Sequence, residues 1–384
     1  MADPVDADTR DALQERAVVL DGTDDPDISP VADTLADATV IGMGESTHGT
    51  HEQFRLKADL FRRLVEEHDV RLFGLEANYS ETLAVDRYVR GADDAPDSAA
   101  DALAATYFWP WYVVELAELV DWLREFNAGR ARAEQVRFVG FDSQYTVGGA
   151  AALQPFLADA DPAFLDEHRD TLEMLADWGL DTDDGEADLF DSRIDDAQAF
   201  LHAFRDRLEQ RRSEYVAATD ERAVRRAELH LATMADAVEL ETIDSRAERL
   251  ERRDRAMADG VDRLLEASPH DRIALWAHNA HVQHAPFDFV GEETRTMGMH
   301  LAERYGDDYA ALGFSFAEGS YQAMAEDEDG EYGLRDCRVD PASTGSVGAT
   351  LGTVEGSPLF LDLRAAENDR LDEFVRRERP IRQP

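Results

Sequence analysis

Short apolar runs recur along the chain, and stretches with helical periodicity separate them. The runs lie at residues 38–42, 71–75, 136–141, 272–276, 309–316 and 358–363. Strands that alternate with helices are typical of a mostly parallel sheet with helices on both faces. The sequence therefore predicts an α/β fold with a mostly parallel central sheet flanked by helices.

The helical periodicity places several elements between the strands. The loop GMGESTHG follows the first run and leads into a helix over 51–67. Further helices are predicted over 79–90 and up to residue 126. A Gly- and Asp-rich stretch reaches residue 356, and a helix over 367–377 closes the chain.

Strand signals vanish between residues 147 and 267, where Ala, Leu, Arg, Glu and Asp dominate. This stretch predicts a large inserted helical subdomain, with an acidic break at 181–187. Most of its charges are interpreted as the solvated faces of packed helices. The α/β core is then expected in two parts, residues 1–146 and 268–384, around the subdomain at 147–267.

The charge balance limits the partners that the chain can bind. It has 39 basic and 83 acidic residues, a formal net charge of −44, and Lys57 is its single lysine. Such a surface repels a nucleic-acid backbone, so no nucleic-acid partner is expected. Its self-repulsion is screened in molar salt, where the Debye length falls to about 3 Å. We predict a protein adapted to a salt-rich cytoplasm.

Further compositional features limit its cofactors and location. One cysteine, Cys337, excludes an internal disulfide and makes a cysteine-based metal site unexpected. No apolar stretch of about 18 residues is present, so no membrane partner is expected. The first residues are acidic and lack the apolar core of a secretory signal, which favours a cytoplasmic location. No cofactor or metal is predicted.

Acid–base residues follow four of the predicted strands. Ligands of open α/β sheets bind at the carboxyl ends of the strands, so we expect these residues on one rim. Two histidines and two glutamates there would suit general acid–base hydrolysis, in which a glutamate orients the histidine that takes a proton from water. The residues concerned are Glu45, His48, Glu76, Asp142, His278 and His281.

Two rival mechanisms use the same region. A serine nucleophile lacks the G-x-S-x-G context, and Ser46 and Thr47 are expected to cap the following helix or to meet an anion. A divalent metal is the second rival, with ligands drawn from Glu45, His48, Glu76 and His278. The H-E-x-x-H signature is absent.

The motifs at 42–49 (GMGESTHG), 140–142 (GFD), 253–258 (RDRAMA) and 276–282 (WAHNAHV) resemble those of the erythromycin esterase family. That family includes members named as succinoglycan biosynthesis proteins, and this chain resembles a haloarchaeal-type member. The resemblance implies a metal-independent hydrolase that opens a macrolide lactone with activated water. It implies that His48 is the base and that Glu45 and Glu76 orient it. It also implies that His278, or else His281, joins the site.

The resemblance also suggests residues that contact substrate. The family's usual arginine nine residues after the base is Lys57 here, and pairing with a carboxylate inside the cleft is one role for it. Trp109 and Trp111 either line an apolar cleft or pack in the core. Asp142 and His281 are expected to shape the site.

The expected partner is a small-molecule ester or lactone, and the sequence does not indicate an oligomeric state. A polysaccharide-related transferase is a second hypothesis, although neither G-x-G-x-x-G nor a P-loop occurs. A third hypothesis is a haem- or ligand-binding protein of related fold, in which His48 is an axial ligand. A fourth is a scaffold without catalytic activity.

Overall fold

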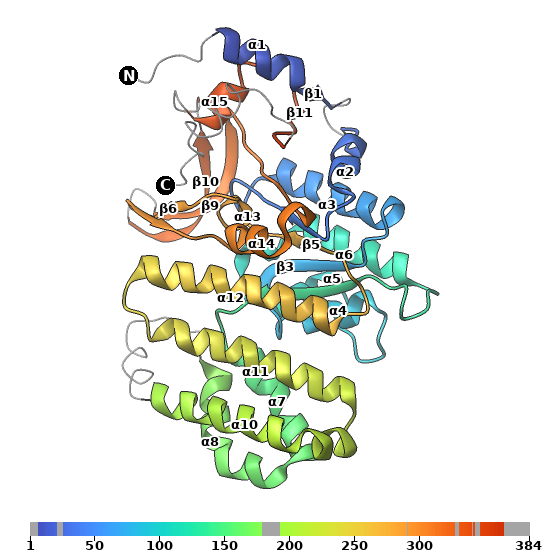
Figure 1. Cartoon of the computed structure of the whole chain (residues 1–384), viewed down its shortest axis with the longest axis vertical. Helices are drawn as coiled ribbons and strands as arrows, with labels where there is room; N and C mark the ends of the chain where they lie inside the picture. The colour runs from blue at the N-terminus through green and yellow to red at the C-terminus, as the bar shows by residue number, and fades with distance from the viewer. Residues whose placement is uncertain are drawn as a thin grey trace. The chain divides into compact units, whose positions relative to one another are not determined.

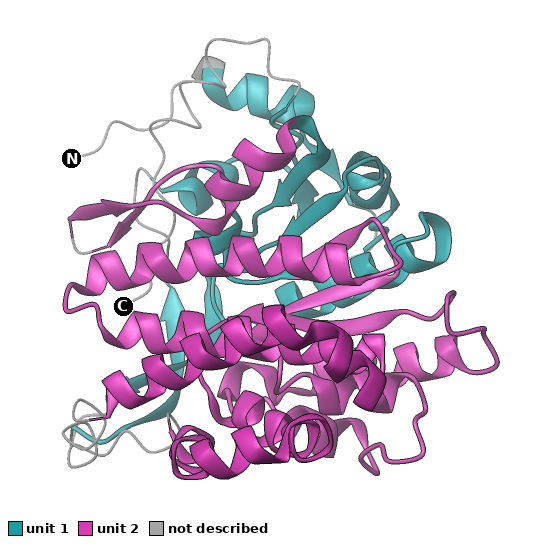
Figure 2. Cartoon of the chain, turned by 60° about the horizontal axis from the view of Figure 1, so that its bottom comes forward, with its two compact units in different colours: residues 1–70, 276–282, 307–384 teal, residues 71–275, 283–306 magenta. Residues whose placement is uncertain are grey.

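The computed structural model describes residues 7–20, 26–178, 193–289, 291–326, 330–339, 341 and 346–364 (Figure 1). The chain forms two compact units (Figure 2). Unit 1 comprises residues 1–70, 276–282 and 307–384, and unit 2 comprises residues 71–275 and 283–306. Each unit is described by itself.

The fold is mixed α/β with a central parallel five-stranded sheet and flanking helices, as the sequence predicted. Its strand order is β4-β3-β5-β2-β8. Each strand overlaps one of the first five predicted apolar runs, although β3 extends three residues beyond its run and β8 ends four residues before the end of its run. The strands are β2 (Val40–Met43), β3 (Leu72–Asn78), β4 (Arg137–Asp142), β5 (Ile273–Trp276) and β8 (Tyr309–Leu312).

The last predicted run, residues 358–363, does not join the central sheet. Strand β11 (Leu359–Phe360) pairs antiparallel with β1 (Val18–Val19) in a separate two-stranded sheet. The helix predicted over 367–377 and the acidic break at 181–187 lie outside the described residues.

Unit 1 is built around the parallel pair β2–β8, in which Val40 lies opposite Tyr309. Helix α3 (His51–Glu67) has the predicted bounds, and it buries Phe54, Leu60, Phe61, Leu64 and Val65 on one face. Its other helices within the described residues are α1 (Ala7–Arg16), α2 (Ser29–Leu35), α13 (Asn279–Val282), η2 (Gly306–Asp308) and α15 (Val347–Leu351).

An antiparallel hairpin in unit 1 was not predicted from the sequence. Strands β9 (Gly319–Glu326) and β10 (Tyr332–Val339) pair along their whole length. Exposed and half-buried residues alternate along β10, so no apolar run marks it. The Gly- and Asp-rich composition of this region concealed a regular element.

Unit 2 contains the parallel pair β3–β4 and the helices that follow it. Helix α4 (Leu83–Val89) is shorter than the predicted 79–90, because the residues from Tyr79 to Thr82 form turns. The remaining elements around this pair are α5 (Ala99–Ala104), η1 (Trp109–Trp111), α6 (Val114–Asn127), β6 (Phe287–Phe289), β7 (Glu292–Thr294) and α14 (Met297–Tyr305).

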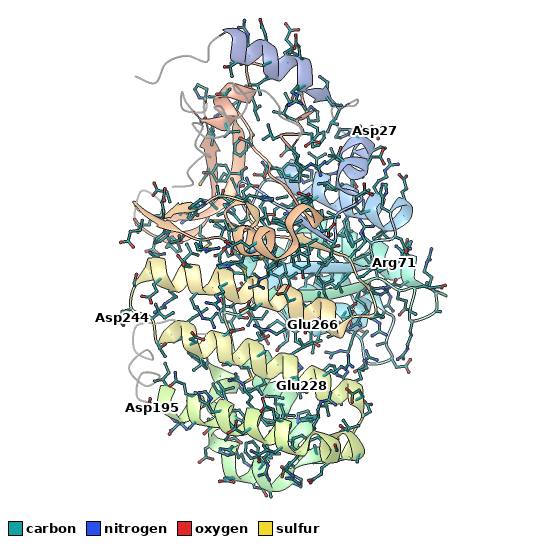
Figure 3. All side chains as sticks on the ribbon, in the orientation of Figure 1. Asp27, Arg71, Asp195, Glu228, Asp244 and Glu266 are labelled. Atoms are coloured by element: carbon teal, nitrogen blue, oxygen red, sulfur yellow. The ribbon has the colours of Figure 1, made fainter. Side chains whose placement is uncertain are left out.

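Long helices make up most of the described residues between 147 and 267 in unit 2. They are α7 (Val147–Ala160), α8 (Pro162–Asp177), α10 (Ile194–Ala218), α11 (Glu221–Glu241) and α12 (Arg246–Ala267). The first four share a core that includes Leu153, Phe164, Phe200 and Phe204. Charged side chains such as Asp195, Asp244 and Glu266 are exposed to solvent (Figure 3). The domain limits at 147 and 267 remain a prediction.

Among the described residues, no helix combines the length and the apolar character that a membrane crossing requires.

Candidate active site

The loop between β2 and α3 holds the first group of predicted site residues. Ser46 and Gln53 bond to each other: Gln53 Nε2 donates to Ser46 Oγ at 2.8 Å, and Ser46 N donates to Gln53 Oε1 at 2.9 Å. Thr47 bonds to the Thr50 hydroxyl. The N-cap residue of α3 is Thr50, and its side chain makes no cap bond. The prediction that Ser46 or Thr47 is the cap is therefore wrong. These side chains hold the shape of the loop instead.

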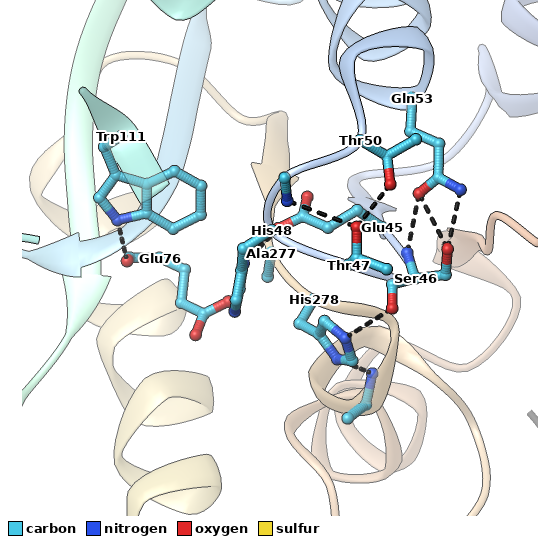
Figure 4. A network of polar contacts seen from close by, with 12 residues as sticks. Glu45, Ser46, Thr47, His48, Thr50, Gln53, Glu76, Trp111, Ala277 and His278 are labelled. Atoms are coloured by element: carbon cyan, nitrogen blue, oxygen red, sulfur yellow. Dashed lines mark hydrogen bonds and ion pairs between the residues drawn. The ribbon is translucent and has the colours of Figure 1, made fainter. Parts of the chain in front are cut away.

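A buried chain of polar contacts runs through this loop to His48 (Figure 4). His48 Nδ1 lies 2.9 Å from Glu45 Oε1, and Lys57 Nζ donates to Glu45 Oε2. The side chains of Glu45 and Lys57 are 0% exposed, whereas that of His48 is 21% exposed. With Nδ1–H donated to the carboxylate, the Nε2 lone pair of His48 is the basic atom of the ring. A buried ion pair thus orients the histidine at the edge of solvent.

Lys57 is not a surface lysine. Its Nζ lies 4.3 Å from the centre of the Trp276 ring, which is a cation–π distance, and it also donates to Ala277 O at 3.4 Å. A buried ammonium must be paired with an anion to be tolerated, and Glu45 supplies that charge. The expected pairing of Lys57 with a carboxylate is therefore observed.

His278 belongs to the same group. Its ring centre is 5.2 Å from that of His48. Ala280 N donates to His278 Nδ1 at 3.1 Å, so the hydrogen of the ring is on Nε2, which lies 3.3 Å from Ser46 O. His281, one turn further on, is buried with 7% exposure. The structure thus places His278, of the two candidates, beside His48.

Close backbone approaches hold this group in place. Asn279 N donates to Glu45 O at 2.8 Å, and its side-chain amide bonds to the backbone of Phe314. In the residue after His48, Gly49 O accepts from Gln322 N of β9 at 3.1 Å. A Cβ on Gly49 would lie 2.0 Å from Gln322 O, so this contact requires glycine. Sequence reasoning did not identify Asn279 or Gln322.

A second group of predicted residues lies in unit 2, with Glu76 inside β3 and Asp142 at the end of β4. Arg253 of α12 donates from Nη2 to Glu76 Oε1 at 2.9 Å and to Asp142 Oδ2 at 2.6 Å. Its Nε donates to Asp142 Oδ1 at 3.0 Å. Both carboxylates are buried, Glu76 at 2% and Asp142 at 1%. Arg253 therefore serves as the shared cation of two predicted site residues.

Arg253 is an exception to the interpretation that most charges of this stretch lie on solvated helix faces. Burial opposes its charge, but the charges of Asp142 and Glu76 outweigh that effect and raise the pKa of Arg253 above its usual value. Its position within the motif RDRAMA was the only sequence signal for it. Asp142 also accepts from Ser143 N and from Gln144 Nε2, at 2.7 and 2.6 Å.

The aromatic run after α5 contacts this second group. Trp111 is fully buried and donates from Nε1 to Glu76 O at 2.9 Å (Figure 4). It is therefore a core residue. Trp109 is half-buried, and its neighbours Tyr107 and Tyr112 are 52% and 62% exposed. Contact of Trp109 with substrate stays a prediction.

The described residues contain no group of three or more His, Cys, Asp or Glu side chains arranged to hold a metal ion. Both oxygens of Glu45 are engaged by His48 and Lys57. The first group can orient an imidazole toward a water molecule, and the second can hold two carboxylates against one guanidinium.

Comparison with known proteins gives concordant matches. Residues 65–383 match the family model described as erythromycin esterase. The chain is 24% identical over 338 residues to erythromycin esterase type II of Escherichia coli, covering 80% of this chain and 76% of that protein. It is 28% identical over 312 residues to erythromycin esterase type I of Escherichia coli, covering 72% and 70%.

Solved structures agree on the fold. A Bacillus cereus protein superposes with a TM-score of 0.79 at 22% identity, covering 98% of this chain and 91% of that one. A succinoglycan biosynthesis protein gives 0.79 at 19% identity, covering 97% and 90%. A mutant erythromycin esterase in its open conformation gives 0.68 at 21% identity, covering 86% and 85%.

Proposed function

The chain belongs to the erythromycin esterase family, and we propose that it cleaves a carboxylic ester or lactone with water activated by His48. Membership supports a hydrolase that acts on a small-molecule ester. The observation that carries the mechanism is the buried Lys57–Glu45 pair behind His48. It fixes the imidazole with its basic nitrogen away from the carboxylate, which is the arrangement that general-base catalysis needs.

The proposed reaction begins with proton transfer from water to Nε2 of His48. The hydroxide oxygen then attacks the carbonyl carbon, and the carbonyl oxygen becomes an oxyanion. Glu45 stabilises the imidazolium, as the carboxylate of a catalytic triad does. The C–O bond to the leaving group then breaks, and the proton held by the imidazolium passes to the leaving oxygen. The products are a carboxylic acid and an alcohol, with no covalent enzyme intermediate.

His278 is proposed to assist the leaving group. Its Nε2 hydrogen is directed to Ser46 O across an N···O distance of 3.3 Å, a long and weak bond. A substrate oxygen bound closer to Nε2 than Ser46 O would receive a stronger hydrogen bond. The hydrogen bond from Ala280 N to Nδ1 fixes the tautomer that makes this donation possible.

Glu76, Asp142, His281 and Trp109 are proposed to act in the same reaction, with Glu76 supporting the base and the others shaping the substrate site. Asp142 and His281 are supported by the family motifs GFD and WAHNAHV. Glu76 and Asp142 are supported by their burial in one charge cluster with Arg253. Trp109 is supported only by its half-buried place in the aromatic run. By analogy with the names of the Escherichia coli relatives, a macrolide lactone is the first substrate to test.

The test is hydrolysis by purified protein in molar KCl, with a panel from aryl esters to 14-membered macrolides, with and without EDTA. His48→Asn should lower kcat/KM by roughly 10²–10⁴ while the protein stays folded. His68→Asn is the matched control, because His68 lies 3.3 Å from Asp33 in unit 1 without belonging to the group. Full activity of His48→Asn would refute the base, and loss of activity with EDTA would indicate a metal enzyme.

A further inference from the structure

Asn279 joins three segments of unit 1 that follow different strands. Its backbone N–H donates to Glu45 O at 2.8 Å, in the loop after β2. Its side chain donates from Nδ2 to Phe314 O at 2.7 Å, and Phe314 N donates to its Oδ1 at 3.1 Å, in the segment after β8. Asn279 itself follows β5 and is next to His278 in the chain.

We propose that Asn279 is a positioning residue that sets the place of Glu45 relative to His278. This inference rests on the proposed function, because it assumes that these two side chains act together. Asn279 does not touch the reacting atoms in this scheme. It acts by fixing the two loops on which the acid–base residues stand.

The side-chain contact uses both halves of the amide. The carbonyl oxygen accepts and the NH₂ group donates, so the amide and the Phe314 backbone form a two-bond ring. Aspartate keeps the acceptor but loses the donor, and it sets a carboxylate oxygen against Phe314 O. Alanine loses both bonds. Neither residue can replace this contact.

Gly44 gives independent support for a fixed arrangement. A Cβ at this position would lie 2.2 Å from Asn279 Oδ1 and 3.0 Å from Leu312 O. Gly44 N in turn donates to Leu312 O at 2.8 Å. The loop that carries Glu45 therefore runs directly against Asn279, with space only for glycine. A side chain in such contact transmits a small displacement to its neighbours.

The consequence for the reaction is a loss of alignment. A displacement of about 1 Å between reacting groups can cost about 10²-fold in rate without removing any catalytic group. Asn279→Ala and Asn279→Asp should therefore lower kcat by about 10- to 100-fold and change KM by less than about 3-fold. The pH profile should keep its shape, because no titrating group is removed.

The matched control is Asn127 of unit 2, which makes the same kind of contact away from the proposed residues. Its Nδ2 donates to Val89 O and Val136 O at 3.1 and 2.9 Å, and its Oδ1 accepts from Val136 N at 2.8 Å. Asn127→Ala loses three such bonds, one more than Asn279→Ala. It should cost stability and leave kcat near the wild-type value.

A second measurement tests the position of Glu45 without an activity assay. Lys57 is the single lysine and contacts Glu45, so ¹³Cε-labelled lysine gives one NMR signal for the whole protein. This signal should shift in both Asn279 variants, because Glu45 moves, and should stay in place in Asn127→Ala. If the wild type hydrolyses no substrate of the panel, the proposed function fails, and this signal still decides the inference.

Each outcome bears on the proposal. A shifted lysine signal together with a lowered kcat in the Asn279 variants supports it. An unshifted signal in both variants would overturn it, and so would wild-type kcat in both variants when the wild type is active. A similar loss of kcat in Asn127→Ala would assign the effect to general destabilisation and would also overturn it.

Discussion

Glu81 is a buried carboxyl group in unit 2 whose ionisation should reduce stability. It follows β3, is 3% exposed, and its Oε1 accepts from Gly148 N at the start of α7 at 3.2 Å. Its Oε2 has no hydrogen-bond partner among the described residues. Burial raises the pKa of Glu81 from 4.5 to about 7, although hydrogen bonds from the backbone of Glu81 and Gly148 oppose that shift.

The size and sign of the effect follow from this pKa. The folded protein binds the Glu81 proton more tightly than the unfolded chain does, so stability falls as the pH rises from about 4.5 to about 7. The shift of about 2.5 units corresponds to about 3 kcal/mol, at about 1.4 kcal/mol per unit. Glutamine keeps the acceptor for Gly148 N and cannot ionise. Glu81→Gln should therefore stabilise the fold by about 3 kcal/mol at pH 8 and by less than about 1 kcal/mol at pH 5.

Urea unfolding at the two pH values, in molar KCl, measures this difference directly. Glu209→Gln is the control, because Glu209 is exposed on α10 and the same chemical change there should alter stability little at either pH. An equal effect of Glu81→Gln at pH 5 and pH 8, or no gain at pH 8, would refute the reasoning.

Three further predictions concern charge. Lys57→Met removes the ammonium that neutralises the buried carboxylate of Glu45 and leaves only the hydrogen bond to His48, so it should cost about 3–5 kcal/mol of stability in urea unfolding and lower kcat as well; an unchanged midpoint would contradict the burial of this pair. Arg253→Met should lower kcat by at least about 10-fold, since one carboxylate it holds is proposed to support the base. Arg137→Met breaks a bidentate pair with Asp86 in the same unit and should leave kcat near wild type, so equal losses in the two arginine variants would refute the distinction. Raising KCl from 0.1 to 2 M should raise Tm, because salt screens a net charge of −44, and a constant Tm would show that self-repulsion is unimportant.

The central sheet was predictable because its strands are short, apolar and buried. Strand β5 has four buried residues and β3 has seven, and each run stands out between helical stretches. The hairpin β9–β10 was not predictable by the same criterion, because most of its residues are exposed or half-buried and only Tyr321 is buried. A separate, half-solvated hairpin has no continuous apolar run to reveal it.

The candidate site was predictable where its residues follow strands, and not elsewhere. Glu45, His48 and His278 come directly after β2 and β5, which is where parallel sheets gather functional groups. The contact between Arg253 and Asp142 joins residues 111 positions apart, and Arg253 lies within a helix rich in other charges. No local spacing distinguishes that arginine, and only the fold shows which carboxylates it meets.

The contact between Gly49 and Gln322 couples the His48 loop to the hairpin β9–β10. A backbone hydrogen bond joins the two segments, and they are packed so closely that no Cβ fits at Gly49. The opening that exposes the Gln322 amide to solvent must therefore also release the loop. A ligand bound next to His48 should therefore slow hydrogen exchange at the Gln322 amide. Exchange at this residue would then report ligand binding even though Gln322 itself need not contact the ligand.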